Sequence, residues 1–406
     1  MNQPSTRPKI TLAIPFAVFP PGRLESRRIF HLYRHLCDRF TVEIVSLADA
    51  GTPHFKGVVA PGMTEIRVPK SAKHQQAEIA MVQGLGANVA DATLMKLYPL
   101  TPRYLSALKK SLSTAKYALC YQPYLLPAIK AVSNKPLWYE ATGIETELKR
   151  KLLPENEAGV EFWEAVSRLE AECCQKSQLI ITSSKALKEE LVTKLAVSSQ
   201  KIVAVPNGIN TRRISFVPYE QRLANKEKLG IKDSFLAIYT GTGSPHNADE
   251  ARSILNMASK LQEINFLLLG NVGIFFEPRL TPPNVRFIPS IDKNTQSIIV
   301  GSADVALNPV TKITDTQSTM LEYFCQGVPV ISTPLGIKEL GINPREHCFV
   351  GETWRFPELL VNCREENTQD KIKRLKKVQK YVKNELEWSK ISQKFLGTFN
   401  PLVLAA

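Results

Sequence analysis

The chain has 406 residues, of which 44% are hydrophobic and 22% are charged, as in ordinary globular proteins. This length predicts two or three domains, each able to bury a core without disulfides. No stretch approaches about 18 consecutive apolar residues, so we expect no membrane-spanning helix. The seven cysteines include no Cys-x-x-Cys pair, which argues against a zinc site and favours reduced thiols in a cytoplasmic protein.

The chain is strongly basic, with 52 Lys and Arg against 38 Asp and Glu and a formal net charge of +14. A nucleic acid, an anionic membrane surface or a phosphorylated small molecule would each attract such a charge. We expect no nucleic-acid partner, because no nucleic-acid motif is present and aromatic residues are not interleaved with the basic ones. An anionic membrane surface and a phosphorylated small molecule both remain possible partners. The alternative is that the charge only keeps the protein in solution.

Short apolar runs alternate with helical patterns from the start of the chain. Ile10–Ile14 predicts a strand, a Pro/Gly-containing loop follows, and apolar residues between 29 and 36 recur at helical spacing before a second strand at Val42–Leu47. Strand, helix and strand in this order indicate a parallel sheet. Further strands are predicted at Tyr117–Cys120, Leu137–Glu140, Leu179–Thr182 and Ile202–Val205.

The alternation restarts after a Pro-Asn-Gly turn at 206–208. Strands are predicted at Leu236–Thr240, Phe266–Leu269, Val285–Ile288, Asp304–Leu307 and Val328–Ser332. Two such series predict an α/β protein with two doubly wound, Rossmann-like domains facing each other, residues 1–208 and 209–384. We expect a C-terminal helix, about 385–406, to pack back on the first domain. The cleft between the domains, at the carboxyl ends of the strands, is the expected ligand site.

The segment Lys371–Lys383 is helical in pattern and very basic, with a narrow apolar stripe of Ile372, Leu375, Val378 and Val382. A basic amphipathic helix can lie on an anionic membrane, which would make the protein peripheral to it. The alternative is a packed helix whose cationic face is solvated.

Three segments carry a resemblance to a known family. The first is Lys176–Leu191, which runs on to Lys201–Asn210, and the others are Ser302–Pro309 and Met320–Thr333. In order and spacing they resemble family 4 of the glycosyltransferases (glycosyl transferases group 1). The resemblance implies the GT-B fold and a cytoplasmic enzyme that uses no metal and no cofactor. It would move a hexose from a nucleoside-diphosphate sugar to a glycan, lipid or small-molecule acceptor, with retention of configuration. The positive charge favours a membrane-linked acceptor, as in surface-polysaccharide or glycolipid assembly.

A helix start in the last of these segments is the expected donor site. Free N–H groups and the helix dipole there favour a pyrophosphate, and the resemblance implies that Glu322 binds the ribose hydroxyls. The residues that the resemblance places on the donor are Ser318, Thr319, Met320, Leu321 and Glu322. The alternative is a capping box, Thr319-x-x-Glu322, in which the carboxylate only bonds the helix backbone.

Two glycines and two cations complete the expected donor contacts. Gly22 and Gly243 would let the backbone approach the phosphates. Arg23 would offer a bidentate donor, and Lys312 would supply positive charge. The alternatives are an ordinary turn glycine and solvated helix charges.

The candidate catalytic residues are Glu140, Glu145 and His246. The segment Trp138–Glu145 resembles an acceptor-side turn of the family, in which Glu140 ends a strand. His246 would contact phosphate or act as an acid or base, unless it is a solvated residue at a helix start.

Three threonines depart from the family pattern. Thr142 stands where the family has a histidine, Thr314 where many members have a glutamate, and Thr319 where others have a lysine. The loop 241–247 also lacks the usual Arg and Lys. These departures motivate an alternative, a catalytically degenerate GT-B scaffold or partner protein of a glycosylation system. A different GT-B enzyme, such as a sugar-nucleotide epimerase, is a third possibility.

Overall fold

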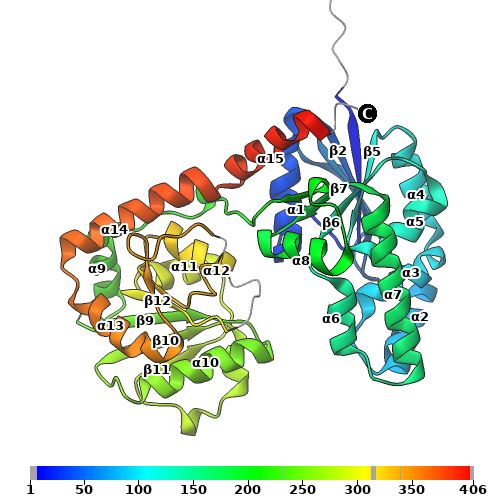
Figure 1. The fold of residues 1–406 in the computed structure, drawn as a ribbon. Coiled ribbons are helices and arrows are strands. Elements are labelled where there is room, and N and C mark those ends of the chain that lie inside the picture. Colours follow the sequence, from blue (N-terminus) through cyan, green and yellow to red (C-terminus); the bar gives the residue numbers. More distant parts are fainter. Residues whose placement is uncertain (1–6, 232, 312–316, 339, 403–406) are drawn as a thin grey trace, which may run out of the picture. The chain divides into compact units, whose positions relative to one another are not determined.

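The computed structural model describes residues 7–231, 233–311, 317–338 and 340–402. The chain divides into two compact units (Figure 1), unit 1 comprising Met1–Asn207 with Ile391–Ala406 and unit 2 comprising Gly208–Lys390. Each unit contains one parallel or nearly parallel sheet with helices on its faces, so the predicted α/β class with two Rossmann-like domains is confirmed. No helix of the described ranges is long and apolar enough to cross a membrane.

Unit 1 is built on an eight-stranded sheet in the order β3-β4-β2-β1-β5-β6-β7-β8. All neighbours are parallel except β3 and β4, which form an antiparallel pair that the sequence patterns did not predict. Strands β5 and β6 are buried along their whole length, as expected for a parallel sheet covered on both faces. The strands are β1 (Lys9–Ile14), β2 (Thr41–Ala48), β3 (Phe55–Ala60), β4 (Met63–Pro69), β5 (Tyr117–Tyr121), β6 (Leu137–Ala141), β7 (Ser177–Thr182) and β8 (Ile202–Ala204).

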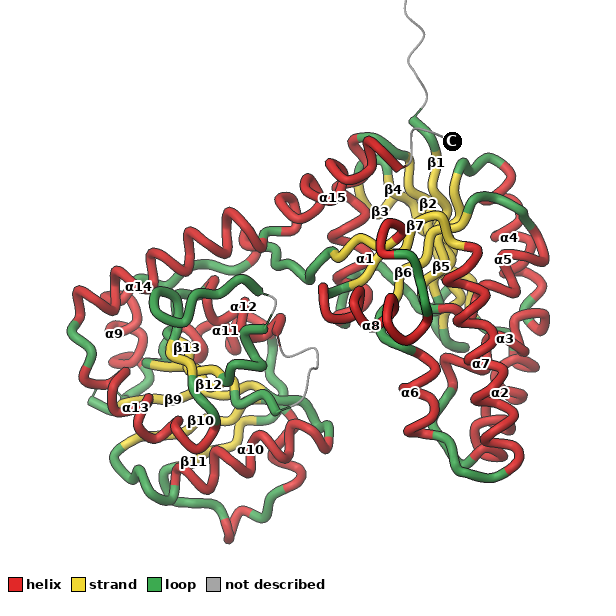
Figure 2. Tube along the Cα trace, in the orientation of Figure 1, coloured by secondary structure: helices red, strands yellow, loops and turns green. Residues whose placement is uncertain are grey.

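Helices cover both faces of this sheet. Figure 2 shows α1 and α15 on the face opposite α4 and α5, and the Ser392 hydroxyl of α15 donates to the Leu32 carbonyl of α1 at 3.2 Å. The helices are α1 (Leu24–Arg34), α2 (Ala72–Leu85), α3 (Ala90–Leu97), α4 (Pro102–Ser113), α5 (Leu126–Val132), α6 (Glu145–Leu152), α7 (Glu157–Lys176), α8 (Lys185–Leu195) and α15 (Trp388–Leu402).

Unit 2 has six parallel strands in the order β11-β10-β9-β12-β13-β14, the strand order of a dinucleotide-binding Rossmann domain. One core cluster joins the sheet to α12 and α14, and another joins it to α10 and α13, so both faces are buried. The strands are β9 (Phe235–Thr240), β10 (Ile264–Leu269), β11 (Val285–Ile288), β12 (Val305–Asn308), β13 (Val330–Ser332) and β14 (Phe349–Val350). The helices are α9 (Tyr219–Lys228), α10 (Pro245–Ala258), α11 (Lys293–Gly301), α12 (Gln317–Cys325), α13 (Phe356–Glu365) and α14 (Thr368–Tyr381).

A buried histidine makes the stability of unit 1 sensitive to acid. His74 of α2 is fully buried, with its Nδ1 atom 2.9 Å from the Thr101 hydroxyl. Burial, together with the nearby Lys70 charge, lowers the pKa of His74 from 6.5 to about 4. The unfolded chain therefore binds one more proton than the folded chain between these pH values, and stability falls as the pH drops through this window.

We expect the His74→Gln variant to lose less stability than the wild type between pH 7 and pH 4. The difference should be on the order of 3 kcal/mol, because one pKa unit corresponds to about 1.4 kcal/mol. Urea unfolding of both proteins at a series of pH values measures it. Parallel pH profiles for the two proteins would show that the pKa of His74 is the same in the folded and unfolded chains, which would contradict the lowered value.

Candidate functional site

The strand orders place one topological switch point in each unit. In unit 1 the order reverses between β1 and β5, and in unit 2 between β9 and β12. Open α/β sheets bind ligands outside the carboxyl ends of the strands at such points. The segments to consider are therefore those that follow β1, β5 and β6 in unit 1 and β9 and β12 in unit 2.

The loop after β1 is held in place by a carboxylate that the sequence reasoning missed. Glu65 of β4 is fully buried and accepts hydrogen bonds from the backbone N–H groups of Val18 at 3.1 Å and Phe19 at 2.9 Å. The Ser46 hydroxyl donates to the same carboxylate at 2.8 Å, and Arg67 Nε donates at 3.2 Å. Loop and sheet are thus joined by one ionic network, which orients the residues that follow.

Gly22 and Arg23 follow this loop at the start of α1. Both are exposed, and a Cβ atom built on Gly22 meets no atom within 4 Å, so the backbone here is open to a ligand. Arg23 caps α1 through its backbone, which exchanges two hydrogen bonds with the Ser26 hydroxyl. Its guanidinium lies 5.5 Å from the centre of the Phe16 ring. Among the described residues no carboxylate pairs with Arg23, so its charge is available to an anion.

Glu140, at the carboxyl end of β6, is committed to other protein groups. Its side chain is fully buried; Arg28 Nε donates to one oxygen at 2.6 Å and the Tyr33 hydroxyl donates to the other at 2.5 Å. Arg28 also donates to the Val205 carbonyl at 2.8 Å and to the Asn207 side chain at 3.0 Å. This network joins α1, β6 and the residues that follow β8 at the end of unit 1. The geometry favours a positioning role for Glu140, while its catalytic role stays a prediction.

Glu145 lies in a polar cluster at the ends of β5 and β6. It is 1% exposed, and its oxygens accept hydrogen bonds from the Tyr124 hydroxyl at 2.6 Å and from Gln122 Nε2 at 3.2 Å. Gln122 also reaches the Thr142 hydroxyl at 3.3 Å. Burial raises the pKa of Glu145, while the Tyr124 hydrogen bond and the Lys149 charge oppose this effect.

Gln122 is the residue of this cluster that no sequence pattern indicated. Its backbone has φ 56° and ψ 166°, a region that is nearly restricted to glycine and costs about 1–3 kcal/mol for other residues. Such strain concentrates at binding and catalytic sites. Gln122 and Thr142 directly follow the carboxyl ends of β5 and β6, and both are half-buried, whereas Glu145 is buried. A polar ligand can therefore reach the side chains of Gln122 and Thr142.

In unit 2, the loop after β9 leads into α10 and contains closely packed backbone. A Cβ atom on Gly270 would lie 2.2 Å from the Gly241 carbonyl oxygen, so only glycine fits beside this loop. Ser244 caps α10 by accepting from the Asn247 N–H at 3.3 Å. Gly243, directly before the cap, is exposed, which leaves backbone next to the positive end of the helix dipole accessible.

His246 lies in the first turn of α10 and is 18% exposed in its side chain, so it is not the solvated histidine of the alternative interpretation. Its Nε2 atom is 3.4 Å from the buried Glu250 carboxylate. The other Glu250 oxygen accepts from the Tyr239 hydroxyl at 2.6 Å and from Asn247 Nδ2 at 3.0 Å. Neither His246 Nε2 nor the Glu250 oxygen nearest to it has a hydrogen-bond partner among the described residues, so the imidazole lies close to the carboxylate without a hydrogen bond to it.

Helix α12 begins earlier than the sequence pattern indicated. Its described part starts at Gln317, so Ser318 and Thr319 are inside the helix rather than in front of it. A capping residue must stand outside the helix, and the Thr319-x-x-Glu322 capping box is therefore wrong. The pattern was misleading because Ser and Thr before an apolar run are common at both capping and first-turn positions.

The other residues of α12 that the resemblance predicts to contact the donor fall into two groups. Met320 and Leu321 are fully buried in the core, so only their backbone could touch a ligand. Glu322 is half-buried on the same helix. The neighbouring Tyr323 hydroxyl lies beside Thr240, the last residue of β9, which brings α12 and the loop after β9 into one corner of unit 2. Lys312, Thr314 and the Ser318 side chain lie outside the described residues.

Comparisons with known proteins identify the fold class of the chain. No protein-family model matches the chain, and no curated protein matches it in sequence. HepE from Anabaena in complex with UDP is similar in structure, with 13% identity, 97% of this chain and 100% of that chain covered, and a TM-score of 0.68. Sucrose-phosphate synthase from Thermosynechococcus elongatus has 14% identity, covers 98% and 100%, and has a TM-score of 0.68. A UDP-forming α,α-trehalose-phosphate synthase from Burkholderia xenovorans has 10% identity, covers 98% and 99%, and has a TM-score of 0.63. The chain therefore has the two-domain GT-B fold.

Proposed function

We propose that this protein is a metal-independent glycosyltransferase that moves a hexose from a nucleoside-diphosphate sugar to an acceptor, with retention of configuration. The observation that carries the proposal is the likeness over 97% or more of the chain to proteins solved with UDP or named as UDP-forming synthases. The acceptor would be a glycan, a lipid or a small molecule. We also propose a cytoplasmic location, which the seven free, buried cysteines support because reducing compartments keep thiols free.

The donor would bind to the corner of unit 2 formed by α12 and the loop after β9. The first-turn backbone of α12 and the exposed Gly243 offer N–H groups to the diphosphate, and Glu322 offers a carboxylate to the ribose. His246, whose imidazole lies close to the buried Glu250 carboxylate, is a titratable group in the first turn of α10 that would approach the leaving phosphate. These positions support the donor assignment because a diphosphate needs cations or many N–H donors to offset its lost hydration.

The acceptor would bind to unit 1. The half-buried Gln122 and Thr142 above Glu145 provide hydrogen-bonding groups for a hydroxyl-bearing molecule. Gly22 and Arg23 are exposed, and no carboxylate of the described residues pairs with Arg23, so this segment would face an anionic group of a bound substrate. In the transfer, the bond between the anomeric carbon and the phosphate oxygen breaks and its electron pair leaves with the nucleoside diphosphate. The acceptor oxygen bonds to the anomeric carbon, and its proton passes to the leaving phosphate oxygen.

The second candidate function is a GT-B protein that supports an active partner without catalysing transfer. The commitment of both Glu140 oxygens to Arg28 and Tyr33 favours it, because these oxygens already bond protein groups rather than a substrate. Thr142 in place of a histidine points the same way. The two candidates differ in whether donor is consumed.

A thermal-shift screen against UDP, GDP, ADP and their common sugar conjugates tests the proposal. We expect one nucleotide to raise the melting temperature by several degrees, since a ligand at about 100 times its Kd stabilises by about 2.7 kcal/mol. The matching sugar conjugate should then be consumed when acceptor is added. No shift at millimolar ligand would overturn donor binding, and a shift without consumption for any acceptor class would favour the supporting role.

A further inference from the structure

Helix α14 uses its apolar side chains inside the protein. Leu375, Val378 and, directly after the helix, Val382 are buried in the core of unit 2, together with the stem of Lys371. Of the apolar stripe seen in the sequence, only Ile372 lies away from this core, and it is half-buried. The stripe is therefore not a membrane-inserting face, because its residues are already packed against the sheet.

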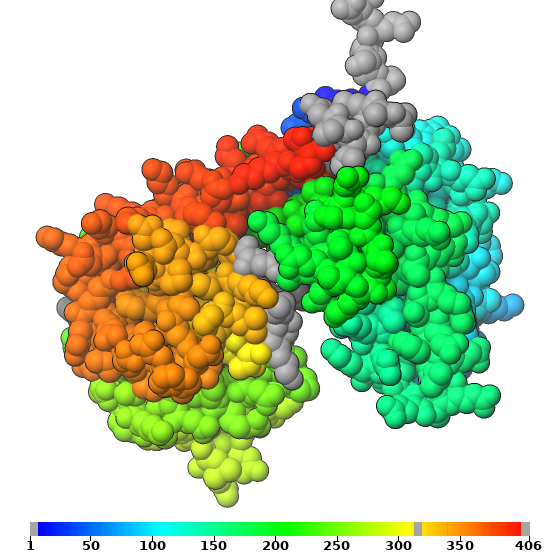
Figure 3. All heavy atoms as spheres, viewed as in Figure 1, coloured from blue at the N-terminus to red at the C-terminus, as the bar shows by residue number. Residues whose placement is uncertain are grey.

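The opposite side of α14 forms a lysine face, which comprises Lys373, Lys376, Lys377, Lys380 and the following Lys383. All five are exposed, and Figure 3 shows α14 and the segment after it as orange-to-red atoms at the surface. Within the lysine face, Lys377 pairs with Glu346 at 2.7 Å, and the described residues provide no ion pair for the other four. Several uncompensated charges along one helix face produce a local positive potential.

A shallow groove of about 500 Å³ runs along the lysine face. Its lining residues are Gln369, Ile372, Lys373, Lys376, Lys377 and Lys380. Lysine stems are apolar while their ammonium groups reach into water. The groove therefore has apolar walls below a rim of positive charge.

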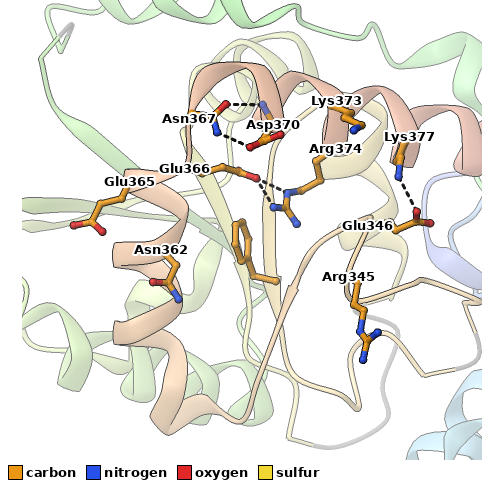
Figure 4. Close-up of a pocket in the computed structure, with 11 residues that line it drawn as sticks. Arg345, Glu346, Asn362, Glu365, Glu366, Asn367, Asp370, Lys373, Arg374 and Lys377 are labelled. Carbon is orange, nitrogen blue, oxygen red and sulfur yellow. Dashed lines mark hydrogen bonds and ion pairs between the residues drawn. The ribbon is translucent and has the colours of Figure 1, made fainter.

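The neighbouring cavity, shown in Figure 4, does not share this character. It measures about 520 Å³ and is lined by four cations and four carboxylates. Arg374 pairs with Glu366 inside it and stacks 4.2 Å from the centre of the Phe349 ring. The four cations and four carboxylates of this cavity balance in number, so it offers less positive charge than the lysine face, with which it shares Lys373 and Lys377.

We propose that the lysine face docks the protein on a membrane surface that contains anionic phospholipids. The phosphates would meet the ammonium rim, and the glycerol region would lie against the apolar walls of the groove. Each lysine near an anionic bilayer contributes about 1 kcal/mol, so the four lysines other than the Glu346-paired Lys377 can hold a protein at the surface without any inserted segment. Nucleic acid fits less well, because no exposed aromatic side chain lines the groove to stack on a base. The inference concerns where the protein binds, so it can fail independently of the proposed transferase activity.

Co-sedimentation with vesicles tests this proposal on the full chain. Vesicles of phosphatidylcholine alone are compared with vesicles that also contain phosphatidylglycerol, at low salt and at high salt. We expect binding only to the anionic vesicles, and its loss at high salt because surface charges are screened. Replacing Lys373, Lys376, Lys380 and Lys383 with glutamine should weaken binding roughly hundredfold or more, from four lysines at about 1 kcal/mol each.

A matched variant separates the lysine face from net charge. Lys73, Lys109, Lys110 and Lys135 are exposed in unit 1, and their replacement by glutamine changes the net charge equally. We expect this control to bind anionic vesicles within a few-fold of the wild type. Equal losses in both variants, or equal binding to neutral vesicles, would overturn the proposal. Two further results would also overturn it. One is a lysine-face variant that still binds the vesicles but no longer binds a DNA duplex. The other is complete competition by inorganic phosphate for the binding of the protein to anionic vesicles. Melting curves of both variants confirm that they are folded.

Discussion

Replacing Glu140 with glutamine will lower the free energy of unfolding by about 3–5 kcal/mol, the range for breaking a buried ion pair. Arg28 is 5% exposed and Glu140 is fully buried, so the variant leaves a guanidinium charge in the interior without its anion. Arginine does not lose its proton in proteins, and the charge cannot be avoided by titration. Denaturant unfolding measures the change, and hydrogen exchange in β6 assigns it to unit 1.

A double-mutant cycle shows whether the effect belongs to the pair. Arg28→Met alone should also destabilise the protein. The double variant Arg28→Met with Glu140→Gln should lose less free energy of unfolding than the sum of the two single changes, because it leaves no unpaired charge of this ion pair in the interior. Glu155→Gln, at an exposed position of the same unit, is the control and should change stability by less than about 0.5 kcal/mol. If Glu140→Gln instead keeps full stability and abolishes sugar transfer, the catalytic prediction for Glu140 holds and the positioning role fails.

The two sheets could be predicted because their strands are buried on both faces. A strand such as Leu137–Ala141 reads as a short apolar run whatever its neighbours are, and helical spacing between such runs implies parallel order. The antiparallel pair of β3 and β4 lacks this signal. Its edge strand is nowhere fully buried, and β4 carries Glu65 and Arg67 within its length. In a sequence these charges indicate a solvated segment, although Glu65 is fully buried by the loop it holds.

The candidate site was less predictable because its contacts join segments far apart in the chain. Glu65 reaches Val18 and Phe19 across more than forty positions, and no local pattern pairs them. Gln122 stands out only through its backbone angles, which composition and spacing do not reveal. Resemblance did indicate Glu140 and Glu145 as a pair, yet the structure places them in two different networks, one with Arg28 and one with Gln122.

Glu322→Gln should weaken binding of the donor nucleotide roughly 10- to 100-fold, because hydrogen bonds from ribose hydroxyls to a charged carboxylate contribute about 1.5–3 kcal/mol. The change preserves side-chain shape, and glutamine is as good a helix former as glutamate. Thr319 lies inside α12, so loss of a Thr319 capping box does not account for the effect of this change, and a melting curve of the variant checks its stability separately. Calorimetric titration with the nucleotide that stabilises the protein gives the affinity, and Glu352→Gln, at an exposed position of unit 2, is the control.

Deoxyribose analogues of that nucleotide identify the group that Glu322 contacts. The wild type should bind the 2′-deoxy or the 3′-deoxy nucleotide more weakly than the parent, because one donor to the carboxylate is missing. The Glu322→Gln variant should discriminate less between parent and analogue, since its neutral amide accepts a weaker hydrogen bond than a carboxylate does. If the variant binds the parent weakly but discriminates against the analogue as strongly as the wild type does, Glu322 does not contact the ribose. Its effect would then come from the position of α12, and the ribose contact would have to be sought on another element of unit 2.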